Sequence, residues 1–133
     1  MKPRITLITI GVDDLERAVK FYRDGLGLKT EGIVGTQFEY GAVAFFDLQE
    51  GLKLALWPRK GIAHDTGIAL GSPSATEFTI GHNVASKVEV DKAMEQAKGA
   101  GGSSPFSAGN LILGCVRFYR LGTLPELCIE LGV

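Results

Sequence analysis

Residues 8–28 read ITIGVDDLERAVKFYRDGLGL, and this stretch passes directly from a strand pattern into a helix pattern. Residues 5–10 are mostly β-branched or apolar, as expected of a strand that is buried on at least one face. Asp13 and Glu16 have the spacing of a capping box, in which two side chains satisfy the first free amides of a helix. The apolar residues that follow have the spacing of a helix with one buried face: Leu15, Ala18, Val19 and Tyr22.

The same helix pattern returns in the second half of the chain. Ser86 and Glu89 repeat the capping box, and a second apolar stripe follows at Val90, Ala93, Met94 and Ala97. Glycines that typically end helices follow both stripes, at Gly25 and Gly27 and again at Gly99, Gly101 and Gly102. Ala18 and Ala93 lie 75 residues apart, as do Gly27 and Gly102, which indicates an internal repeat.

Strand-like runs flank both predicted helices. One run precedes each helix, at 5–10 and 77–84, and further runs follow, at 42–48, 52–57, 111–119 and 126–131. This order predicts an α+β fold made of two βαβββ modules. We expect residues 1–133 to form a single domain, with module one at about 1–57, a linker at 58–75 and module two at 76–133. A linker of this length is expected to serve as a lid, ligand wall or interface arm, or else to be mobile.

Composition excludes several classes of partner. The chain has 14 Lys and Arg against 15 Asp and Glu, for a net charge of −1. No positive excess is therefore present to neutralise nucleic acid or an anionic membrane surface. No apolar run approaches the roughly 20 residues that span a bilayer, and residues 5–10 are too short for a signal peptide. We therefore expect a cytoplasmic protein that binds neither nucleic acid nor membrane.

Residues 8–28 resemble the opening of vicinal oxygen chelate proteins, the superfamily that includes glyoxalase I, bleomycin-resistance proteins and extradiol dioxygenases. The resemblance rests on Val-Asp-Asp-Leu at 12–15, Ala18, Phe-Tyr at 21–22 and Leu-Gly at 26–27. Residues 78–84, which read FTIGHNV, resemble a branch of the same superfamily. The resemblance implies that the two modules form a curled mixed sheet around a U-shaped cleft. It also implies a homodimer, because short members generally complete their clefts across a dimer interface.

Enzymes of this superfamily bind a divalent metal through His and Glu side chains on the first and last strands of each module. Carried over to this chain, those positions fall on Leu7, Leu54 (or Ala55 with a shift of one residue), Thr79 and Glu130. Only Glu130 keeps the expected residue type, whereas a catalytic site normally has three protein ligands. The sequence therefore predicts a degenerate metal site and no cofactor, with weak divalent metal binding through Glu130 and His82 left open.

Several strand residues are candidates for a functional site. Glu130 is the candidate catalytic residue, because a carboxylate among apolar neighbours can have a raised pKa suited to proton transfer. The ligand-binding candidates are residues expected to wall the cleft: Phe46, Trp57, Thr79, His82 and Tyr119. Core packing of the aromatic residues and hydrogen bonding of His82 at a strand end are the alternative interpretations.

These patterns support two main hypotheses about function. The first is a small-molecule-binding protein of the glyoxalase/bleomycin-resistance type without a complete metal site. The second is a lyase or isomerase of the glyoxalase class that uses Glu130 with a weak or shifted metal site. A stand-alone regulatory module is a third interpretation. Each of the first two implies a small organic ligand.

Overall fold

The computed structural model describes residues 4–72, 79–83, 86–102, 115–121 and 124–130. The chain divides into two compact units, Met1–Ser72 and Pro73–Val133. The first unit contains module one and the second contains module two.

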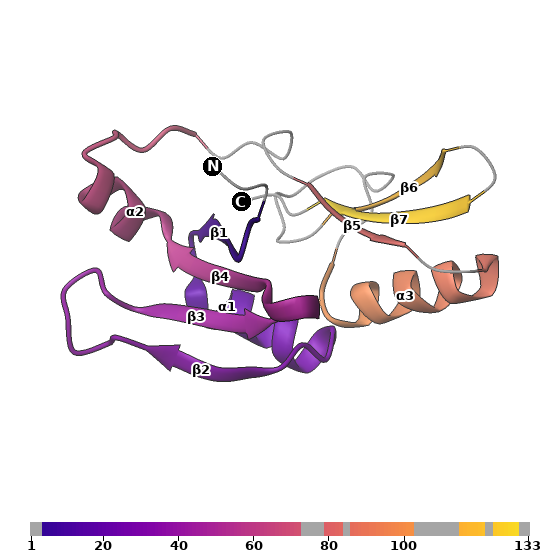
Figure 1. The fold of residues 1–133 in the computed structure, drawn as a ribbon, viewed down its shortest axis with the longest axis horizontal. Helices are drawn as coiled ribbons and strands as arrows, with labels where there is room; N and C mark the ends of the chain where they lie inside the picture. Colours follow the sequence, from indigo (N-terminus) through magenta and orange to yellow (C-terminus); the bar gives the residue numbers. More distant parts are fainter. Residues whose placement is uncertain (1–3, 73–78, 84–85, 103–114, 122–123, 131–133) are drawn as a thin grey trace. The chain divides into compact units, whose positions relative to one another are not determined.

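Module one has the predicted βαβββ order (Figure 1). It consists of β1 Leu7–Val12, α1 Leu15–Lys20 continued by a π-helix at Phe21–Gly25, β2 Thr30–Val34, β3 Val43–Asp47 and β4 Lys53–Pro58. The four strands form one sheet in the order β1-β4-β3-β2. β1 and β4 are parallel and the other pairs are antiparallel, so the sheet is mixed and the α+β class is confirmed.

The first helix begins one residue later than the sequence pattern indicated. Asp14 is the N-cap, and its Oδ1 accepts a hydrogen bond from the amide of Arg17 at 2.9 Å. The predicted cap, Asp13, instead has its carboxylate 3.4 Å from the Arg59 guanidinium. Both aspartates have a side chain suited to capping, so sequence alone did not distinguish them.

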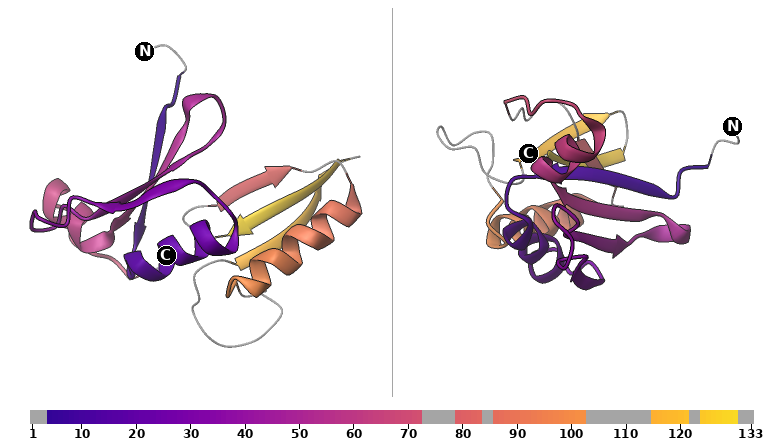
Figure 2. Two further views of the ribbon diagram at one scale, coloured as in Figure 1. Left: turned by 90° about the horizontal axis from the view of Figure 1, so that it is seen from below. Right: turned by 90° about the vertical axis from the view of Figure 1, so that its left-hand side faces the viewer.

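The core of module one lies between the helix and one face of the sheet. All four residues of the predicted stripe are buried: Leu15, Ala18, Val19 and Tyr22. α1 packs against β2, β3 and β4 and covers this face of the sheet (Figure 2). On the sheet face that packs against α1, the largest fully buried side chains are Phe46, Leu54 and Leu56. Together these side chains remove a continuous apolar surface from water, which is the main stabilising term of the module.

The predicted linker contains a helix. α2 spans Arg59–Thr66, begins directly after β4, and ends at Gly67, whose φ of 68° is left-handed. The first half of the predicted linker, residues 58–75, is therefore largely helical. Gly61 and Pro58 made this helix hard to predict, because glycine weakens helices and proline usually interrupts them. Proline is nevertheless tolerated at a helix start.

Module two follows the same plan in the part of the chain that is described. β5 spans Thr79–Asn83, α3 spans Lys87–Gly99, β6 spans Cys115–Leu121 and β7 spans Leu124–Glu130. The strands form an antiparallel sheet in the order β5-β7-β6, and α3 packs against β7 (Figure 2). Ser86 caps α3 as predicted, since its Oγ accepts a hydrogen bond from the amide of Glu89 at 3.3 Å. Residues 111–114 of the predicted strand lie outside the described residues.

No helix in the described part of the chain has the length and apolar character needed to cross a membrane.

Candidate functional site

The face of the module-one sheet opposite α1 carries the candidate site, and we call it the open face. Strand register assigns residues to it, because paired residues share a face and neighbours along a strand alternate. Its first row is Leu7, Lys53 and Asp47; its middle row is Thr9, Ala55 and Phe45; its third row is Gly11 and Trp57. Leu7, Thr9 and Phe45 are exposed, and Ala55 is the small, buried centre of the middle row.

The structure corrects the placement of the predicted aromatic residue on β3. Phe46 is fully buried on the helix side, where its ring centroid lies 5.6 Å from that of Tyr22. Phe45 lies on the open face and is 38% exposed. Phe45, and not Phe46, is therefore the β3 aromatic residue available to a ligand.

The same one-residue correction applies to β4. Leu54 is 2% exposed on the helix side, paired with Ile8 and Phe46. Ala55 occupies the open-face position that the family uses for a metal ligand on the last strand. Neither an aliphatic side chain nor a methyl group offers a lone pair to a metal ion.

One feature of the sequence would have set the strand phase correctly. Asp47 and Lys53 are the charged residues of β3 and β4, and their side chains form an ion pair on the open face. Charged side chains are seldom buried, so each fixes which alternate residues face solvent. Counting back from Asp47 selects Phe45, and counting forward from Lys53 selects Ala55 and Trp57.

Helix α2 packs over one end of the open face. An ideal Cβ added to Gly11 would lie 3.0 Å from Cγ of Arg59 and 3.2 Å from Cδ1 of Ile62. An ideal Cβ on Gly61 would lie 2.5 Å from Nε1 of Trp57. α2 therefore covers the row that contains Gly11 and Trp57, and it leaves the middle and first rows uncovered by that helix.

The polar groups at this covered end are already hydrogen-bonded. Trp57 donates from Nε1 to the main-chain oxygen of Tyr40 at 2.9 Å. The Arg59 guanidinium donates to the main-chain oxygen of Gly71 at 2.7 Å and to Asp13 at 3.4 Å. At this covered end of the open face, the Trp57 and Arg59 donors therefore bond to oxygens elsewhere in module one, and carbon atoms of Arg59 and Ile62 lie nearest to Gly11.

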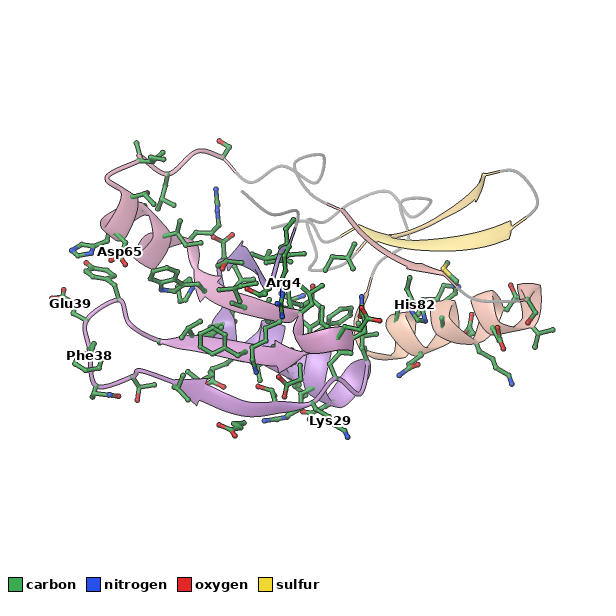
Figure 3. All side chains as sticks on the ribbon, viewed as in Figure 1. Arg4, Lys29, Phe38, Glu39, Asp65 and His82 are labelled. Carbon is green, nitrogen blue, oxygen red and sulfur yellow. The ribbon has the colours of Figure 1, made fainter. Side chains whose placement is uncertain are left out.

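An aromatic cluster lies where α2 meets the loop between β2 and β3. The rings of Tyr40 and His64 stack with centroids 4.5 Å apart, and His64 Nδ1 lies 3.3 Å from Asp65 Oδ1. Figure 3 shows Phe38 and Glu39 on that loop and Asp65 on α2 beside it. His64 lies on α2, where its ring stacks on Tyr40 while its side chain remains 61% exposed.

Two pKa shifts in module one have clear physical causes. Burial raises the pKa of Tyr22, whose hydroxyl is also the buried polar group without a hydrogen-bond partner among the described side chains. On the exposed helix surface, the hydrogen bond from Arg23 lowers the pKa of Asp24. Neither group lies on the open face.

Module two places three of the predicted site residues on one face of its sheet. Thr79 and Glu130 are direct partners in the β5–β7 ladder, and Cys115 pairs with Glu130 from the other side. Tyr119 pairs with Glu126, an even number of residues from Glu130, and so belongs to the same face. The side chains of these residues lie outside what the structure describes.

His82 belongs to the opposite face of that sheet. The ladder is regular from Thr79↔Glu130 to Asn83↔Glu126, and His82 pairs with Leu127. His82 is exposed. Because Glu130 and Leu127 are an odd number of residues apart, the register does not bring His82 and Glu130 to one ion.

The residues present do not fit the metal site of the fold. In module one, the first and last strands carry Leu7 and Ala55 at the open-face positions. Across the described residues, no group of three or more His, Cys, Asp or Glu side chains is placed to hold a metal ion. No chemical step is therefore derived through a metal.

Sequence and structure comparisons agree with this fold. A model of the Glyoxalase/Bleomycin resistance protein/Dioxygenase superfamily matches residues 4–109. The chain belongs to this superfamily. No curated protein sequence matches the chain significantly.

Three solved structures illustrate the likeness. A glyoxalase-related enzyme from Fulvimarina pelagi is 26% identical with a TM-score of 0.62, over 92% of this chain and 76% of that one. A glyoxalase/bleomycin resistance protein/dioxygenase from Nocardioides is 25% identical with a TM-score of 0.59, over 90% of this chain and 77% of that one. A hypothetical protein from S. aureus is 21% identical with a TM-score of 0.62, over 87% and 85%, and it shows the fold alone.

Proposed function

We propose that the chain is a small-molecule-binding protein of the glyoxalase/bleomycin-resistance type that holds its ligand without a complete metal site. The observation that carries this proposal is the composition of the open face. Leu7 and Phe45 are 46% and 38% exposed there, at and beside the positions where the superfamily places metal ligands. Exposed apolar side chains gathered on one sheet face favour contact with an apolar or aromatic molecule.

The physical basis of binding is removal of apolar surface from water. A flat ring placed on Phe45 and Leu7 gains roughly 25 cal/mol for each Å² that it covers, and an offset stack with the Phe45 ring adds about 0.5–1.5 kcal/mol. The Thr9 hydroxyl lies beside Ala55 in the middle row and offers one donor and acceptor. Neither contribution requires a metal ion.

The test uses an uncharged aromatic probe, 2-naphthylmethanol, and protein treated with a chelator. We expect saturable binding by calorimetry that the chelator does not change and that Phe45→Ala weakens about tenfold, as expected for loss of an aromatic contact. Phe38→Ala is the matched control, because Phe38 is 67% exposed on the loop between β2 and β3. Binding that requires a metal, or that weakens equally in both variants, would contradict the proposal.

A second candidate function is a lyase or isomerase of the glyoxalase class that uses Glu130. The observation in its favour is the backbone pairing of Glu130, the one retained metal-ligand position, with Thr79 on the first strand of module two. Elemental analysis after incubation with zinc, nickel, manganese and iron tests it. Stoichiometric metal that is lost in Glu130→Gln would favour this function over metal-free binding.

We also propose that the protein is a homodimer, as short members of the superfamily generally are. Light scattering tests this directly. A monomer at micromolar concentration would contradict a site shared between two copies, and it would leave the open face of one copy as the binding surface.

A further inference from the structure

The open face is chemically different at its two ends. At one end, Gly11 lies beneath the side chains of Arg59 and Ile62 of α2, at the distances given above. At the other end, the first row contains the ion pair between Lys53 and Asp47, whose side chains are 50% and 66% exposed. One end is therefore closed and apolar, and the other has two charged side chains beside the exposed Leu7 and is accessible to water.

The polar side chains at the closed end, Trp57 and Arg59, already hydrogen-bond to other parts of module one. The Trp57 indole is bonded to Tyr40, and the Arg59 guanidinium is bonded to Gly71 and Asp13. The atoms nearest to an ideal Cβ on Gly11 are all carbons: Cγ and Cα of Arg59 and Cδ1 of Ile62. A polar group pressed against this wall would lose its water and gain no hydrogen bond in return.

The charged end offers the opposite environment. The Lys53 ammonium is a donor and the Asp47 carboxylate is an acceptor, and both remain in contact with solvent. Lys29 lies opposite Asp47 at the start of β2, since the Asp47 amide bonds to the Lys29 main-chain oxygen at 3.1 Å (Figure 3). A polar head at this end keeps its hydration or exchanges it for these charged partners.

We infer that the open face selects amphiphilic molecules with a single polar end, bound with the apolar end against α2 and the polar head towards Lys53 and Asp47. This inference rests on the proposed function and specifies its class of ligand. Molecules with polar groups at both ends are disfavoured, because one group must be buried against Ile62 and Arg59. Charge at the head is secondary, since both signs are present in the first row.

Two isomers of one compound separate orientation from hydrophobicity. In 2,3-naphthalenedimethanol both hydroxyls are at one end, whereas in 2,6-naphthalenedimethanol they are at opposite ends. We expect the 2,3-isomer to bind the wild-type chain about tenfold more tightly, the factor expected for one buried hydroxyl without a partner. Equal affinities, or tighter binding of the 2,6-isomer, would overturn the inference.

Variants of α2 locate the effect. Ile62→Ala shortens the wall over Gly11 and admits water, so we expect the ratio between the isomers to fall at least threefold. Ile68→Ala, at a side chain 70% exposed beyond the helix, is the matched control and should keep the wild-type ratio. An unchanged ratio in Ile62→Ala would show that α2 does not form the wall. Ile62→Val provides a milder variant if the alanine variant loses α2.

Failure of this inference is distinguishable from failure of the proposed function. If 2-naphthylmethanol binds but the two isomers do not differ, the open face binds ligands without the proposed orientation. If none of the three compounds binds, the proposed function fails together with the inference. Nuclear Overhauser contacts give an independent readout: ring protons should contact the Ile62 methyls, and the hydroxymethyl protons should not.

Discussion

The indole Nε1 of Trp57 donates a hydrogen bond to the main-chain oxygen of Tyr40 at 2.9 Å. This bond joins the end of β4 to the loop before β3, and the Tyr40 residue that it contacts has a φ of 61°. A left-handed backbone at a tyrosine is unfavourable and persists only where the surroundings hold it. Trp57, the stacked His64 ring and α2 provide these surroundings.

Gly61→Ala should destabilise module one by about 1–3 kcal/mol, the usual effect of overpacking a tight site. The added Cβ would lie 2.5 Å from Trp57 Nε1 and 2.9 Å from the Tyr40 main-chain oxygen. Urea denaturation followed by Trp57 fluorescence measures the change, since Trp57 is the one tryptophan in the sequence. Gly71→Ala is the control, because an ideal Cβ there has no neighbour within 4 Å. Equal stability of the two variants would contradict the close packing of α2.

Tyr22→Phe should raise the free energy of unfolding at neutral pH by about 1 kcal/mol, because it removes a buried hydroxyl without a hydrogen-bond partner among the described residues. Tyr40→Phe is the control and should be nearly neutral, since Tyr40 is 41% exposed. Chemical denaturation of the three proteins checks this. Destabilisation by Tyr22→Phe would mean that the hydroxyl has a partner.

The same side chain predicts a dependence on pH. Burial raises the folded-state pKa of Tyr22, so above the ordinary tyrosine pKa of about 10 the unfolded chain releases a proton that the folded chain retains. The folded state then binds more protons than the unfolded state, and stability falls as pH rises. Each pH unit removes up to about 1.4 kcal/mol. The stability difference between wild type and Tyr22→Phe should therefore widen from pH 9 to 11, and a constant difference would contradict it.

Phe46→Ala should lower the stability of the chain, whereas Phe45→Ala should lower its affinity for ligand. Phe46 is fully buried, so its truncation should destabilise the chain by about 3–5 kcal/mol. Phe45→Ala should change stability by less than about 1 kcal/mol and act on ligand binding instead. Thermal denaturation and probe calorimetry separate the two effects. Comparable destabilisation by both variants would contradict the assignment of Phe45 to the open face.

Arg59→Ala should loosen the segment that follows α2. The Arg59 side chain is 17% exposed and bonds the main-chain oxygen of Gly71, and loss of such a charged hydrogen bond costs about 1.5–3 kcal/mol. Hydrogen exchange measured by mass spectrometry should show faster exchange across residues 67–72. Lys60→Ala, at an exposed neighbour on α2, is the matched control. Unchanged exchange in Arg59→Ala would show that other contacts hold this segment.

Much of the fold was predictable because local patterns repeat. The stripe from Leu15 to Tyr22 is buried as its spacing predicted, and Ser86 caps α3 as predicted. Apolar strand-like runs at 5–10, 42–48 and 52–57 marked β1, β3 and β4 within a few residues of their bounds. These features follow from spacing along the chain and need no knowledge of distant contacts.

The candidate site was less predictable because it depends on strand phase. Phe45 and Phe46 are identical in type, and Leu54 and Ala55 are both apolar, so apolar content does not show which residue of each pair faces the helix. A shift of one residue moves a side chain to the other face of a sheet. The residue types at the metal positions were nevertheless clear from sequence, since Leu54 and Ala55 are equally unable to bind a metal.

The sequence by itself determined that the chain contains two strand-helix-strand modules, and it predicts that most metal-ligand positions of the superfamily are replaced. Local spacing and residue chemistry are sufficient for both conclusions. Only the tertiary structure decided that α2 covers Gly11 and that Asp13, and not Asp14, pairs with Arg59. Each of these joins residues far apart in the chain or selects between equivalent neighbours, and packing against the rest of the module makes that selection.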